Sequence, residues 1–67
     1  GPYFFNGQRA VKNAIAELGI NASEENLFTS AKSRLYKAHG EQYKALYTQR
    51  AKNSLLNFIR KFKESSV

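Results

Sequence analysis

The sequence predicts an all-α fold, a small three-helix bundle with a short 3₁₀ or helical turn between its second and third helices. Three stretches carry apolar residues at spacings of three and four, the period that gives a helix one buried face. Glycines follow the first two stretches, and residues that favour the N-cap position precede each of them. With 67 residues and no cysteine, the core must form by packing alone.

The first helix is expected over Gly7–Leu18, with Asn6 as its N-cap. Gly19 is expected to end it by adopting a positive φ. The residues on its predicted buried face are Val11, Ala14, Ile15 and Leu18.

The second helix is expected over Glu24–Ala38, between an N-cap at Ser23 and a stop at Gly40. Its glutamates lie in the first turn and its basic residues in the later turns, as the helix dipole favours. The predicted buried face consists of Leu27, Phe28, Ala31, Leu35 and Ala38.

The next stretch breaks the helical phase, because a continuous helix would place Leu46 on the polar side. We therefore expect Tyr43, Leu46 and Tyr47 in a short 3₁₀ turn. Thr48 is then the expected N-cap of a third helix, Gln49–Glu64. Its predicted inward residues are Ala51, Leu55, Phe58, Ile59 and Phe62, with Leu56 at the edge.

Residues 3–64 are predicted to form one helical domain, followed by a frayed tail at 65–67. Gly1–Pro2 is interpreted as the remnant of a cleaved expression tag, which implies a longer parent protein. No apolar run approaches the roughly 20 residues of a membrane span. We expect an intracellular domain, with the nucleus as a candidate compartment.

The net charge of +6 is concentrated in the stretch Tyr43–Lys63, which contains no acid. Its basic residues are Lys44, Arg50, Lys52, Arg60, Lys61 and Lys63. The basic residues outside this stretch equal the acids in number. Such a concentration favours an anionic partner, either nucleic acid or an acidic or phosphorylated protein segment, and the alternative is a basic surface that serves only solubility.

Polar residues opposite the predicted core of the third helix form a stripe with the chemistry of a nucleic-acid site. Its members are Arg50, Asn53, Asn57, Arg60 and Lys61. Arginine and lysine neutralise phosphates, and asparagine can pair with the edge of adenine. We predict a nucleic-acid or anion-binding site, for DNA or RNA, to whose field Lys44, Lys52 and Lys63 add.

No catalytic activity, cofactor or metal is expected. The acids are scattered, and the serines and threonines lack a plausible histidine and aspartate constellation. No glycine-rich phosphate loop is present. His39, the single histidine, has no cysteine partner and is interpreted as compensating a helix dipole.

The order of elements resembles the FF domain, a small helical module of splicing, transcription and signalling proteins. The resemblance covers Ala10–Lys63, where QYKAL (Gln42–Leu46) is similar to the family's short turn and KNSLLNFI (Lys52–Ile59) to its last helix. Val11 and Leu56 stand where the family has phenylalanines, and its usual tryptophan is absent. The resemblance implies a protein-binding module that engages acidic or phosphorylated peptides.

A second resemblance covers Ala31–Asn53, where YKALYTQRAKN is similar to part of the polymerase-binding central domain of the transcript-cleavage elongation factors. Both resemblances imply a binding module in gene expression. Two alternatives to nucleic-acid binding stay open. One is a peptide groove formed by the third helix with Tyr36, Tyr43 and Tyr47. The other is a structural domain that packs on its parent protein through Tyr3–Phe5.

Overall fold

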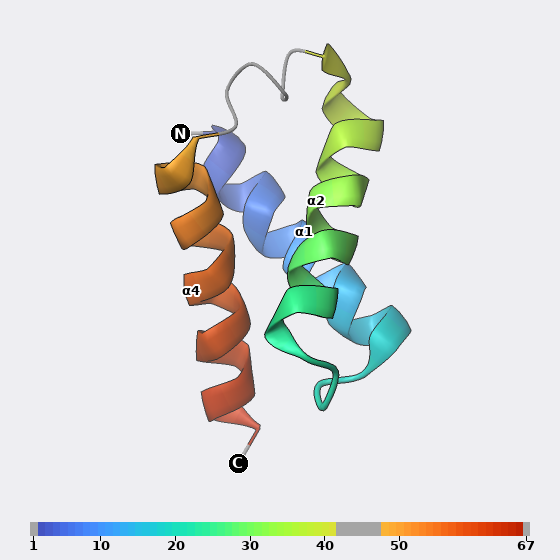
Figure 1. Ribbon diagram of the computed structural model, residues 1–67, viewed down its shortest axis with the longest axis vertical. Coiled ribbons are helices and arrows are strands. Elements are labelled where there is room, and N and C mark those ends of the chain that lie inside the picture. Colours follow the sequence, from blue (N-terminus) through green and yellow to red (C-terminus); the bar gives the residue numbers. More distant parts are fainter. Residues whose placement is uncertain (1, 42–47, 67) are drawn as a thin grey trace.

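The computed structural model places three helices in mutual contact: α1 (Pro2–Leu18), α2 (Glu24–His39) and α4 (Gln49–Ser65). It describes residues 2–41 and 48–66, with side chains from residue 7 onward. In Figure 1, α2 and α4 stand on either side of the view and α1 passes behind them. The predicted all-α, three-helix bundle is confirmed, and the turn predicted around Tyr43–Tyr47 lies outside the described residues.

Helix α1 begins at Pro2, so the prediction of a helix start at Gly7 with an N-cap at Asn6 is wrong. Proline is common at the first position of a helix, because its fixed φ is already helical. A backbone N–H at that position would have no hydrogen-bond partner within the helix, so proline loses nothing by lacking one. Gly7 is a packing residue within the helix. A Cβ at this position would lie 3.3 Å from Leu55 Cδ2, so the glycine lets α4 pack closely against α1.

The buried face of α1 differs from the prediction at its two ends. Val11 and Ala14 are fully buried as predicted, and Ala10 is buried as well. Leu18 is 44% exposed, so its predicted burial is wrong. It is the last residue of the helix, and the chain turns away at Gly19, where φ is 91°. The predicted glycine stop is confirmed.

Helix α2 begins and ends close to the predicted positions. The Ser23 side chain accepts a hydrogen bond of 3.1 Å from the backbone N–H of Asn26, which confirms the N-cap. At the other end, Gly40 has a φ of 66° and its N–H donates to the carbonyl of Tyr36. Leu27, Ala31 and Leu35 are buried and Phe28 is half-buried, whereas Ala38, near the end of the helix, is exposed. The burial predicted for Ala38 is therefore wrong.

Helix α4 follows the N-cap predicted at Thr48, whose side chain accepts a hydrogen bond of 3.3 Å from the N–H of Ala51. It continues through Ser65, one residue past the predicted end. Its predicted inward residues split into two groups. Leu55, Phe58 and Ile59 are buried, and Ala51, Leu56 and Phe62 are half-buried.

The three helices share one apolar core. Among the described residues, its buried members are Ala10, Val11, Ala14, Leu27, Ala31, Leu35, Leu55, Phe58 and Ile59. Full burial of a large aliphatic side chain such as Leu27 or Ile59 contributes about 1.5–3 kcal/mol. Because α4 contributes three of these residues from one side of the helix, its opposite side is held facing solvent.

Candidate nucleic-acid interface

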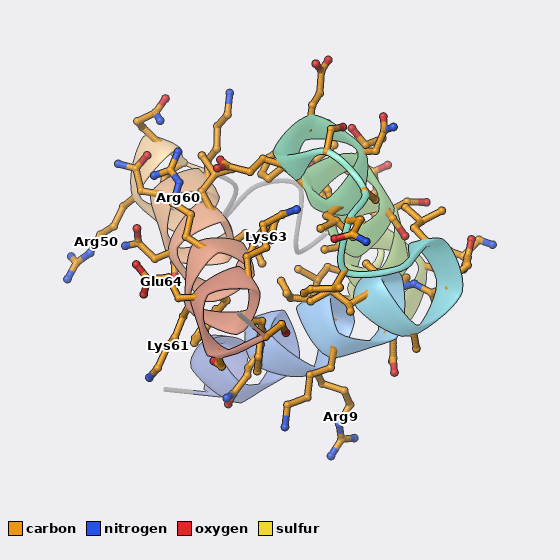
Figure 2. The ribbon with its side chains drawn as sticks, turned by 90° about the horizontal axis from the view of Figure 1, so that it is seen from below. Arg9, Arg50, Arg60, Lys61, Lys63 and Glu64 are labelled. Atoms are coloured by element: carbon orange, nitrogen blue, oxygen red, sulfur yellow. The ribbon has the colours of Figure 1, made fainter. Side chains whose placement is uncertain are left out.

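The predicted polar stripe lies on the outer side of α4, opposite the buried Leu55, Phe58 and Ile59. Its members, all of them exposed, are Arg50, Asn53, Asn57, Arg60 and Lys61. In Figure 2, which looks along the bundle from below, Arg50 points away from the other two helices. The sequence therefore predicted the orientation of the stripe correctly, but the individual side chains differ in their contacts.

Arg60 already has an acidic partner. Its Nη2 lies 3.0 Å from Glu24 Oε1, and its Nε donates to the same oxygen at 3.1 Å. Both side chains are about half exposed, so the pair contributes little stability. It nevertheless cancels one positive charge of the stripe and links α4 to the first turn of α2. The sequence did not reveal this pairing, because it joins residues 36 positions apart.

Lys63 faces the inside of the bundle and does not belong to the stripe. Its Nζ donates hydrogen bonds to the carbonyl oxygens of Ile20, at 2.8 Å, and Ala22, at 2.6 Å. Figure 2 shows the side chain extending from α4 toward the loop between α1 and α2. An ammonium held by two carbonyl groups ties this loop to the last turn of α4. We therefore assign Lys63 a structural role in place of the predicted anion-binding role.

Lys52 and Asn53 also have contacts of their own. The Nζ of Lys52 lies 5.6 Å from the centroid of the Phe28 ring on α2, within the range of a cation–π contact. Asn53 Oδ1 accepts a hydrogen bond of 3.0 Å from Gln49 Nε2 on the preceding turn. Lys52 therefore lies at the side of α4 that meets α2, and the amide of Asn53 is partly occupied.

Three predicted site residues remain open to a ligand. Arg50, Asn57 and Lys61 are exposed, and their side chains make no hydrogen bond or ion pair with another residue in the described ranges. Lys44 lies outside those ranges. Glu64 was not predicted to belong to the site, but Figure 2 shows it on the same outer side of α4 as Arg50. Its carboxylate weakens the positive field near the end of the stripe.

Two basic residues of α1, Arg9 and Lys12, were not predicted to belong to the site, because the acids of the chain equal in number the basic residues outside Tyr43–Lys63. The structure pairs Glu17 with Arg34 and Glu24 with Arg60, so neither acid compensates Arg9 or Lys12. Both of these α1 residues are exposed. The helical period of the sequence already places both off the Val11 face, in agreement with their exposure. The pairing of the acids required the three-dimensional structure.

A hollow of about 700 Å³ lies between α1 and α2, away from the stripe, and its lining includes Leu18, Arg34 and Lys37. Among the described residues, no group of three or more His, Asp or Glu side chains is arranged to hold a metal ion. In the same part of the chain, no helix combines the length and apolarity needed to cross a membrane.

Comparison of the chain with protein-family models, with curated proteins and with solved structures finds no significant match. The FF-domain and elongation-factor resemblances therefore stay expectations from the sequence.

Proposed function

We propose that this chain is a non-catalytic helical binding module of the gene-expression machinery and that it binds nucleic acid through the outer face of α4. The observation that carries the proposal is the state of Arg50 and Lys61. Both are exposed, and neither forms an ion pair with an acid in the described ranges. They lie 11 positions apart on one helix, which corresponds to about 16 Å along its axis at about 1.5 Å per residue.

The chemistry of this face is suited to a polyanion. Lysine and arginine side chains that approach the phosphates displace the counterions condensed on the nucleic acid, and this release supplies most of the sequence-independent affinity. Asn57 lies between the two cations and leaves an exposed amide for hydrogen bonding. The chain's net charge of +6 adds long-range attraction that speeds association.

Fluorescence anisotropy with labelled duplex DNA, single-stranded DNA and RNA at two salt concentrations tests the proposal. The double variant Arg50→Gln and Lys61→Gln keeps good helix formers at both positions while removing two charges. If both cations contact phosphates of a duplex, the slope of log K against log salt falls by about 1.8. The matched control is Lys32→Gln with Lys37→Gln, which removes two charges from α2.

Absence of binding by the unmodified chain at low salt would overturn the proposal, as would equal losses in the α4 variant and the α2 control. The main competing function is docking of an acidic or phosphorylated peptide on the same cations. In that case, a phosphopeptide or a polyglutamate would bind with an affinity that matches or exceeds that of the oligonucleotides. Of the tyrosines expected to line such a groove, Tyr36 is half-buried against the core, and Tyr43 and Tyr47 lie outside the described residues.

A further inference from the structure

The acids of this chain are unevenly distributed around the bundle. Glu24 and Glu25 begin α2, Glu41 follows its end, and Glu17 on α1 pairs with Arg34 on α2. Four of the five acids therefore lie on α2, pair with it or follow its end. The side of the molecule where α1 meets α4 has Glu64 as its one acid, because all five acids lie within the described residues.

Three cations lie on that side, and we call them the α1/α4 seam: Arg9 and Lys12 of α1 and Lys61 of α4. All three are exposed. Figure 2 shows Arg9 and Lys61 projecting from the same lower side of the bundle. Lys12 is placed there by its contact with α4, since its Nζ lies 5.7 Å from the centroid of the Phe62 ring. Because Phe62 adjoins Lys61 in sequence, this contact places Lys12 beside the turn of α4 that carries Lys61.

The contact between Lys12 and Phe62 also organises the seam before any ligand arrives. Phe62 is half-buried against the core, so its ring is a fixed support. A lysine held over such a ring loses less side-chain freedom when it binds an anion. Its ammonium keeps N–H groups for a phosphate oxygen, since a cation–π contact does not use all three donors.

We propose that the α1/α4 seam is the part of the interface that contacts the sugar–phosphate backbone, so that nucleic acid is bound across two helices and without regard to base sequence. The proposal rests on the nucleic-acid-binding function proposed above. The seam offers cations with a single acid nearby, whereas the centre of the α4 stripe has Asn53 bonded to Gln49 and Arg60 bonded to Glu24. Phosphates are therefore expected to lie toward α1, and few groups remain to read base edges.

The test is an anisotropy titration of the full chain with duplexes of mixed, A·T-rich and G·C-rich sequence at several salt concentrations. The variant Arg9→Gln with Lys12→Gln removes two seam charges that are not part of the α4 stripe. Its slope of log K against log salt should fall by about 1.8 on all three duplexes, because each lost phosphate contact removes about 0.9. Single-stranded DNA and RNA of the same sequences form further arms, for which about 0.7 per contact is expected.

The control variant is Lys32→Gln with Lys37→Gln on α2. It removes the same charge, and Lys32 also lies over a phenylalanine, 5.8 Å from the Phe28 centroid. Thermal unfolding of each variant establishes that it folds as the parent does. The control should keep the salt slope of the unmodified chain. If it loses as much slope as the seam variant, net charge alone explains the binding and the seam proposal is overturned.

Four further outcomes distinguish the failure of this inference from the failure of the proposed function on which it rests. No binding by the unmodified chain at low salt would overturn both proposals. Normal binding by the Arg9→Gln, Lys12→Gln variant, together with weak binding by the Arg50→Gln, Lys61→Gln variant, would overturn the seam alone. A seam-variant loss confined to one duplex sequence, or displacement of DNA by an equal charge concentration of polyglutamate, would also contradict backbone recognition of nucleic acid by the seam.

Discussion

Replacement of Lys63 by methionine is predicted to destabilise the fold while leaving nucleic-acid affinity nearly unchanged. Methionine keeps an unbranched side chain and a similar helix propensity, but it cannot donate to the carbonyl oxygens of Ile20 and Ala22. A hydrogen bond that involves a charged group contributes about 1.5–3 kcal/mol net. The ordering of a lysine side chain offsets up to about 2 kcal/mol of the sum.

Two such bonds contribute about 3–6 kcal/mol, and subtraction of the ordering cost leaves about 1–4 kcal/mol. Because both bonds are only partly buried, we expect a loss in the lower half of this range, about 2 kcal/mol. In a domain of this size, a change of 1 kcal/mol moves the Tm by about 4–8 °C, so we expect a decrease of about 10 °C. Circular dichroism during thermal and urea unfolding measures it. The matched control is Lys61→Met on the same helix, because the ammonium of Lys61 has no ion-pair or hydrogen-bond partner in the described ranges.

The two lysine variants should behave in opposite ways. Lys63→Met lowers the Tm and spares binding, whereas Lys61→Met stays within about 0.5 kcal/mol of the parent, as is usual for an exposed site, and weakens binding. Equal stability of the two variants would refute the structural role assigned to Lys63. A loss of affinity on Lys63→Met equal to that on Lys61→Met would return Lys63 to the anion-binding site.

Two further substitutions test other contacts. Glu24→Gln releases Arg60 from its ion pair, so the salt slope for duplex DNA should steepen by up to about 0.9 at a stability cost below about 1 kcal/mol. Glu25→Gln in the same turn is the control, and identical slopes for both would contradict the prediction. Gly40→Ala forces alanine into φ 66° and ψ −151°, a region that suits glycine, and should cost about 1–3 kcal/mol in urea unfolding. A loss below about 0.5 kcal/mol would show that the turn relaxes easily.

The helices could be predicted because their signals are local. Apolar spacing, the N-caps Ser23 and Thr48, and the stops Gly19 and Gly40 all act within a few residues of the backbone they control. The start of α1 was predicted wrongly because Asn6 is a favourable N-cap residue and Gly7 is a poor helix former, so the pair is typical of a helix start. Gly7 instead lies inside α1, where a Cβ would meet Leu55 Cδ2 of α4 at 3.3 Å, a contact between residues far apart in the sequence.

The orientation of the candidate site was also predictable, since periodicity alone places Arg50, Asn57 and Lys61 opposite the core of α4. The partner of each charge was not. Arg60 meets Glu24 and Lys63 meets the carbonyl of Ile20, and each contact spans about 40 residues of chain. Charge counting along the sequence placed the whole excess on one segment, whereas in the structure Arg9 and Lys12 of α1 also have no ion pair among the described residues.

The most direct test of the central claim, that nucleic acid binds on the α4 face and the α1/α4 seam, is NMR chemical-shift mapping of the labelled chain during titration with a short duplex. Backbone amide shifts are expected to concentrate around Arg50, Asn57 and Lys61 on α4 and around Arg9 and Lys12 on α1. The exposed face of α2, from Asn26 to Lys37, should change little. Shifts concentrated on α2, or an absence of shifts at low salt and excess duplex, would contradict it.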